Sequence, residues 1–191
     1  MNLLVDTLPE AVEVDGVMYE IDTDFRQCLR IIMAFEDPEL TNFEKQMIML
    51  TNLYGENAPE NLHGALKAAI GFLDGAFVVD EDQARNGPKV YSFNKDAMLI
   101  YSAFSQTHGV DLSMVDMHWW KFLALFMDLG AETTFTELVG LRKRVKTGTA
   151  TKEERKLARD LGSVFVVEDY HDYTTEELEM SREFMEALGE A

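Results

Sequence analysis

The sequence predicts a mainly α protein, a compact bundle of about eight helices that opens with a β-hairpin. Helix-capping residues recur along the chain, and glycine or proline separates the segments that they start. Only a short stretch near the N-terminus alternates apolar and polar residues. The 191 residues, 47% of them hydrophobic, suffice to bury a core of their own.

The alternating stretch is VEVDGVMYEI, residues 12–21. Asp15 and Gly16 stand in its middle, and such a pair is typical of the two-residue turn between hairpin strands because both turn positions require positive φ. We therefore expect a short hairpin here, ahead of the helices.

The first helix should be DFRQCLRIIMAF, which Asp22 or Thr23 can cap. It must stop before Pro38 because proline disfavours helical geometry at the preceding residue. Thr41 and Glu44 then have the spacing of a capping box and should start the second helix.

Gly55 is expected to end the second helix, since glycine is common just past a helix C-terminus. Pro59 suits the first position of a third helix, which continues through ENLHGALKAAIGFLDG. Residues 76–93 then interrupt the helical pattern with an acidic run and Asn-Gly-Pro, which are typical of a loop. Short strands are expected within it at residues 77–79 and 90–92.

Helices should resume with one that runs from Asn94 or Asp96 to His108. An aromatic-rich helix is expected at residues 113–129. Further capping boxes are formed by Thr134 with Glu137, Thr151 with Glu154, and Thr174 with Glu177. The helix that begins at Thr134 should end near residue 145.

The chain has no Ser/Gly-rich linker, internal repeat or low-complexity tract. We therefore expect one mainly α domain over residues 1–167, including the hairpin. Residues 168–191 are expected to form an acidic, detachable C-terminal helix.

Charge restricts the classes of partner. With 17 basic and 35 acidic residues the net charge is −18, which should repel nucleic acid and anionic membranes. Cys28 is the single cysteine, so no internal disulfide can form and a reducing cytoplasm fits best. The first residues, MNLLVDTLPEAVEVDG, lack the basic start and apolar run of a signal peptide.

The aromatic segment MHWWKFLALFMDLG raises the choice between a membrane anchor, a core helix and a partner surface. A membrane span needs about 20 apolar residues, and this run is shorter and contains charge. Helical spacing places Trp119, Phe122 and Phe126 on one face, which we expect to be core. Trp120 points elsewhere and either contacts a second helix or belongs, with Met127, to an exposed apolar edge that binds a partner.

Residues 142–159, RKRVKTGTATKEERKLAR, concentrate positive charge. They hold eight of the 17 basic residues and two acidic ones, a net charge of +6 that leaves the remainder at −24. The segment is either a solvated helix pair or a contact surface for an acidic partner, which includes another copy of the chain. The candidate interaction residues here are Arg142, Lys143, Arg144 and Lys146.

The sequence contains no phosphate-binding loop, dinucleotide fingerprint, zinc spacing or nucleophile elbow. Cys28 lies in mid-helix among apolar residues and is expected to be a buried, inert thiol. Asp169, His171 and Asp172 could in principle hold a divalent metal, but a solvated loop before a capped helix explains them without one. We expect no catalytic residue and no cofactor.

Several segments resemble the bacteriophage gene-product-fifteen family. They are LLVDTLPEAVEVDGVMYEIDTDFR, EDPELTNFEK, VYSFNKDAMLIYSAFSQTHGVDL and MHWWKFLALFMDLGAETTFTELVGLRKR. The most specific pieces are residues 21–26, 91–93 and 118–122. The resemblance covers residues 1–145, continues more loosely to 167, and leaves the C-terminal segment outside.

This resemblance implies a role in tail morphogenesis, as a tail-assembly chaperone-like protein that binds tape-measure or other tail subunits. It leaves self-association open as a further interaction. It implies action in the host bacterial cytoplasm and absence from the mature virion. The main alternative is a structural tail or connector subunit that the virion retains. A metal-assisted hydrolase that uses Asp169, His171 and Asp172, and an acidic mimic of DNA, are more remote alternatives.

Overall fold

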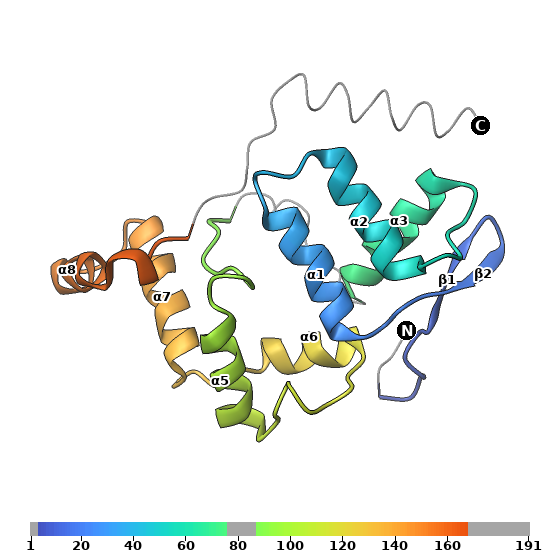
Figure 1. Ribbon diagram of the computed structural model, residues 1–191. Coiled ribbons are helices and arrows are strands. Elements are labelled where there is room, and N and C mark those ends of the chain that lie inside the picture. Colours follow the sequence, from blue (N-terminus) through green and yellow to red (C-terminus); the bar gives the residue numbers. More distant parts are fainter. Residues whose placement is uncertain (1–3, 76–86, 168–191) are drawn as a thin grey trace. The chain divides into compact units, whose positions relative to one another are not determined.

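The computed structural model describes residues 4–75 and 87–167 (Figure 1), and it confirms a mainly α fold with an N-terminal hairpin. The described part contains seven α-helices. The elements are β1 Ala11–Val14, β2 Val17–Glu20, α1 Phe25–Glu36, α2 Asn42–Tyr54, α3 Leu62–Leu73, α5 Ala97–His108, α6 Trp119–Met127, α7 Thr134–Lys146, α8 Lys152–Leu161 and the 3₁₀ helix η1 Gly162–Val164. The helix expected after Thr174 lies outside the described residues.

The described residues divide into two units. The first contains residues 4–75 and Asp116–Leu123, and the second contains residues 87–115 and 124–167. The expected boundary of a single domain at residue 167 stays a prediction, and the segment 168–191 lies outside the described residues.

The hairpin forms as the sequence predicts. β1 and β2 pair antiparallel, and Asp15 and Gly16 make the turn with φ values of 52° and 80°. These positive angles match the twist of the adjoining strands. Asn61, which precedes α3, donates from its amide to the Asp15 carboxylate at 2.8 Å and ties the turn to that helix.

The start of α1 differs from the prediction. Asp24 is the cap, and its carboxylate accepts a hydrogen bond from the backbone N–H two residues later, so the expected caps Asp22 and Thr23 are wrong. The reason is tertiary, because the Thr23 carbonyl accepts the Trp119 N–H at 2.7 Å and Asp24 forms an isolated antiparallel bridge with His118. The predicted stop before Pro38 is confirmed.

The capping box of α2 is confirmed, with Thr41 and Glu44 bonded reciprocally, and the helix ends before Gly55 as expected. α3 begins later than predicted. Its cap is Asn61, whose side chain accepts the Gly64 N–H at 2.9 Å. The prediction that Pro59 opens this helix is therefore wrong, because a side-chain cap two residues further on satisfies the first turn.

The aromatic helix is shorter than the predicted 113–129, because residues 113–118 are not helical. The Asp111 carboxylate accepts both the N–H and the hydroxyl of Ser113, at 2.9 and 2.6 Å, and forms a local turn. His118 then pairs with Asp24 in an isolated antiparallel bridge, which delays the helix start to residue 119.

Both indoles lie in the core of the first unit. Trp119 and Trp120 are 2% and 8% exposed, and their N–H groups donate to the Leu73 and Phe72 carbonyls at 2.8 and 2.7 Å. Both carbonyls lie in the last turn of α3, and that of Phe72 also accepts the Gly75 N–H at 3.1 Å. Phe122 is fully buried as expected.

In the second unit, the expected strand at residues 90–92 does not form. The Ser92 N–H donates instead to the Asp96 carboxylate at 3.0 Å, and the Val90 carbonyl accepts a hydrogen bond from Arg142 at 3.1 Å. The other expected strand, 77–79, lies outside the described residues. Asp96 is the cap of α5, which confirms one of its two predicted starts. The helix ends at His108, as predicted.

α7 is capped one residue earlier than predicted. The Thr133 hydroxyl accepts the Thr136 N–H at 3.2 Å, so the expected box of Thr134 with Glu137 is wrong. Thr134 is already the first helical residue. Phe126, expected in the core, stays partly exposed while its ring packs against those of Tyr91, Phe93 and Phe135.

Candidate interaction surface

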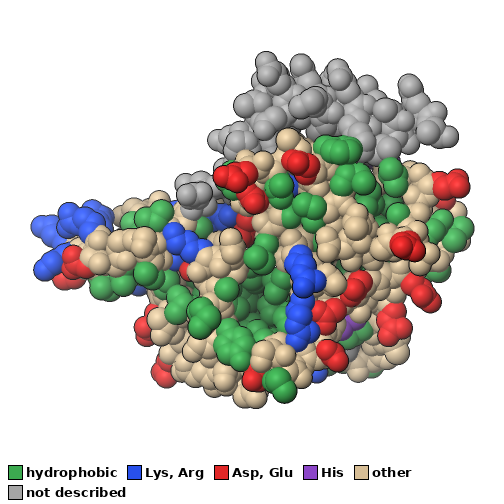
Figure 2. Space-filling model, in the orientation of Figure 1, with side chains coloured by type: hydrophobic (Ala, Val, Ile, Leu, Met, Phe, Trp, Pro, Cys, Tyr) green, Lys and Arg blue, Asp and Glu red, His purple; other side chains and the backbone are tan. Residues whose placement is uncertain are grey.

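The surface formed by α7, α8 and the segment after α8 contains most of the predicted basic residues. A tight connection holds the helices together, because the N–H groups of Thr149 and Ala150 donate to the Arg144 carbonyl at 2.9 and 3.0 Å. Thr151 and Glu154 then form the predicted capping box of α8. In Figure 2 the Lys and Arg side chains gather over α8, at the left of the view.

Arg142, a predicted contact residue on this surface, is instead fully buried. Its guanidinium forms a bidentate ion pair with Asp96, at 2.7 and 3.0 Å. It also donates to the carbonyls of Val90, Val164 and Phe165. The prediction is wrong because burial leaves no donor for a partner, and Arg142 holds three chain segments of its own unit together.

The other three predicted basic residues are exposed. Arg144 pairs with Glu154, with 2.7 Å between Nε and the carboxylate oxygen. Lys146 donates to the Val167 carbonyl at 3.3 Å. Lys143 is also exposed, and it takes part in neither the ion pair with Glu154 nor the hydrogen bond to Val167.

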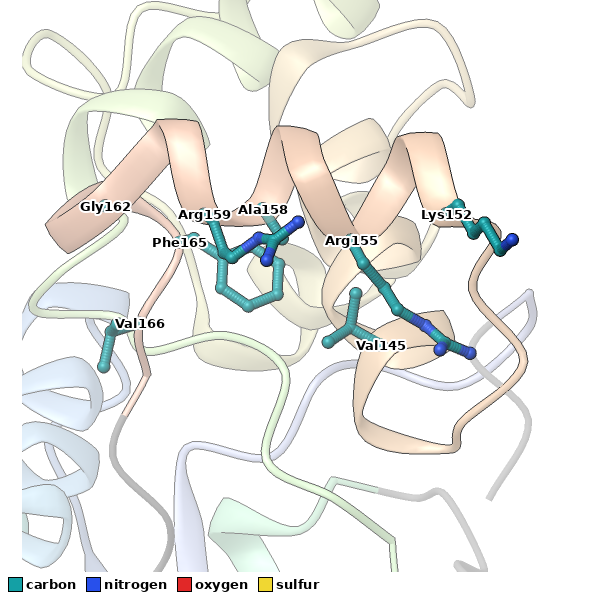
Figure 3. Close-up of a pocket in the computed structure, with 8 residues that line it drawn as sticks. All are labelled: Val145, Lys152, Arg155, Ala158, Arg159, Gly162, Phe165 and Val166. Atoms are coloured by element: carbon teal, nitrogen blue, oxygen red, sulfur yellow. The ribbon is translucent and has the colours of Figure 1, made fainter.

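A groove of about 700 Å³ lies between α8, the end of α7 and the segment that follows η1 (Figure 3). Its lining combines an apolar floor with a row of cations and contains no acidic residue. We call it the α8 groove, and it is lined by Val145, Lys152, Arg155, Ala158, Arg159, Gly162, Phe165 and Val166. Of the ten residues of α8, Ala158 alone is buried, so most of this helix faces outward.

The cations of the α8 groove have few internal partners. Arg155 donates to the Gly148 carbonyl at 3.3 Å, while Lys152 and Arg159 pair with no carboxylate of residues 4–75 or 87–167. Glu154, on the same helix, points into the capping box. The Thr151 N–H, and then the Arg144 guanidinium, lower the pKa of its carboxyl.

A second hollow, of about 600 Å³, lies on the other flank of α8. Apolar side chains from α5, α7, α8 and η1 line much of it, namely Leu99, Leu138, Leu141, Leu157, Leu161 and Val164. Leu157 and Val164 are about half exposed. α8 therefore has an accessible apolar surface beside it on two sides.

The two residues predicted to form an exposed apolar edge, Trp120 and Met127, differ in their exposure to solvent. Trp120 is buried against α3, so the reading as a contact to a second helix is confirmed and the exposed reading is wrong. Met127, at the end of α6, is 67% exposed. It remains available to a partner.

Sequence reasoning missed the groove floor at Phe165 and Val166. The signal was the apolar run Val-Phe-Val-Val at residues 164–167, which begins at the last residue of η1. Such a run with no helical or strand period does not reveal which neighbour it packs against.

The described residues contain no group of three or more His, Cys, Asp or Glu side chains placed to hold a metal ion. Asp169, His171 and Asp172 lie outside those residues. Cys28 is fully buried as predicted, and burial, followed by the charges of Asp22 and Asp24, raises the pKa of its thiol. No helix of residues 4–75 or 87–167 has both the length and the hydrophobicity needed to cross a bilayer.

Comparison with known proteins gave one family. The model of the family described as Bacteriophage Gp15 protein matches residues 4–165. Searches of curated proteins and of solved structures gave no match.

Proposed function

This chain belongs to the bacteriophage Gp15 family, and from that premise we propose that it acts as a tail-assembly chaperone-like protein. In this role it binds tape-measure or other tail subunits during tail morphogenesis. It works in the host bacterial cytoplasm and leaves before the virion is complete.

The α8 groove is the observation that carries this proposal. An apolar floor beside cations that pair with no carboxylate of the described residues suits recognition of another polypeptide, because apolar contact supplies affinity and charge supplies specificity. Exposed methionines add adaptable apolar surface on the same unit, at Met98, Met114 and Met127.

Binding, and not catalysis, is the proposed activity. The buried ion pair of Arg142 with Asp96 is enclosed by backbone carbonyls, and neither residue lines either hollow beside α8. Cys28 is buried with a raised pKa, which disfavours the thiolate that a nucleophile requires.

Co-expression with the tape-measure protein of the same phage tests the proposal. The tape-measure protein should remain soluble and co-purify when this chain is present, and should aggregate when it is absent. A tape-measure protein that is equally soluble in both cases, and that does not co-purify, would reject the proposal.

A further inference from the structure

The α8 groove has the layout of a receptor for a charged helix. Lys152, Arg155 and Arg159 follow one another along α8 in Figure 3, at intervals of three and four residues that keep them on one side. We propose that the groove binds an acidic amphipathic helix of a client polypeptide. This inference rests on the proposed function, because it names the class of client segment that the groove receives.

The cation row defines the carboxylate spacing of the client. A helix that lies antiparallel to α8 would meet the row with carboxylates at positions j, j+4 and j+7, and a parallel one with j, j+3 and j+7. An apolar stripe about a quarter turn from these carboxylates would face the floor formed by Val145, Phe165 and Val166.

The groove is built before any client arrives. Arg142 Nε donates to the Phe165 carbonyl at 2.8 Å, and its Nη2 donates to the Val164 carbonyl at 2.6 Å. Because Arg142 is itself fixed by Asp96, the backbone of the floor is held in place from beneath. A fixed floor lowers the entropic cost of binding.

Two other occupants fit less well. Nucleic acid would leave the apolar floor without an apolar partner, and the aromatic ring of the groove, Phe165, is only partly exposed for base stacking. The chain's own residues 168–191 are acidic, but the family model ends at residue 165. It includes every groove residue except Val166, so the groove belongs to the part that the family shares.

Fluorescence anisotropy of the full chain with a labelled peptide tests the inference. The probe is a synthetic helix of about 20 residues with a glutamate stripe beside a leucine stripe. The groove variant is R155E/R159E. The matched control is K67E/K121E, which makes the same charge change at two exposed lysines of the other unit.

Binding of the peptide should weaken at least about tenfold in R155E/R159E and remain nearly unchanged in K67E/K121E. Circular dichroism checks folding, and if the reversed variant unfolds, R155Q/R159Q replaces it with the same expected direction. A version of the peptide with lysine for every glutamate is attracted by the net charge of −18, so its binding should not weaken in R155E/R159E.

Equal affinity for both variants would overturn the inference, and so would weaker binding of the lysine peptide in R155E/R159E than in the unaltered chain. Tighter binding of a single-stranded oligonucleotide than of the glutamate peptide would likewise contradict it. Absence of peptide binding to the unaltered chain would also overturn the inference. This holds even if the cause is that another ligand or residues 168–191 fill the groove. Such results would leave the co-expression test intact, because a client could still bind elsewhere.

Discussion

Arg142 and Asp96 form a buried bidentate ion pair between α7 and the residue before α5, with exposed side-chain fractions of 1% and 3%. The remaining guanidinium donors bond to backbone carbonyls, so the buried charge is fully compensated. The pair therefore determines how the segments of its unit pack.

Replacement of Arg142 by methionine should destabilise the protein by roughly 3–5 kcal/mol, because Asp96 and three carbonyls lose their partner. Chemical denaturation measures the change. Arg144→Met, which breaks the exposed pair with Glu154, serves as control and should have a much smaller effect. Similar losses in both variants would contradict the structural role assigned to Arg142.

Trp120 should be shielded from solvent. In a Trp119→Phe variant the remaining indole should emit at short wavelength and resist quenching by acrylamide, because its N–H donates to a buried carbonyl. The same variant in denaturant provides the exposed reference. Strong quenching under native conditions would restore Trp120 as a surface residue.

Glycine-to-alanine changes should have opposite signs at two open positions. Gly16 has φ of 80°, so alanine there should cost about 1–2 kcal/mol although no atom obstructs its Cβ. Gly71 lies inside α3 with equally open surroundings, and alanine there should stabilise by about 0.5–1 kcal/mol. Thermal unfolding of the two variants measures both, and changes of the same sign would contradict the turn geometry.

The capping box of α8 should make stability depend on pH through Glu154. The Thr151 N–H, and then Arg144, lower the pKa of this carboxyl, so its ionised form stabilises the fold above its ordinary pKa. That contribution is lost as pH falls through the lowered pKa. Glu154→Gln should therefore destabilise at neutral pH and converge with the unaltered chain in acid.

Unfolding titrations at several pH values check this prediction. Glu153→Gln, which neutralises the neighbouring exposed carboxylate outside the box, is the control and should change the pH profile less. A Glu154→Gln difference that does not vary with pH would contradict the assigned hydrogen bonds.

The features that sequence reasoning predicted correctly are those with local causes. Asp15 with Gly16, and the boxes that begin at Thr41 and Thr151, depend on residues within three positions of one another. The caps of α3 and α7 were placed wrongly because Asn61 and Thr133 compete locally with Pro59 and Thr134. The other errors arose where distant segments compete. The bridge of Asp24 with His118 moved the start of α1 and shortened the aromatic helix.

The candidate surface was predicted in part for the same reason. The concentration of positive charge was visible in the sequence, but the burial of Arg142 depends on Asp96, which lies 46 residues away. Trp120 was ambiguous because the α3 carbonyl that it meets is 48 residues away. Neither pairing has a local signal.

The most direct test of the account is mass spectrometry of this chain's complexes, isolated from infected cells during tail assembly, together with purified virions. The account predicts that the tape-measure or another tail protein co-purifies with the chain, and that the chain is absent from the virions. A chain that is present in virions in fixed stoichiometry, or that captures no tail protein, would contradict it.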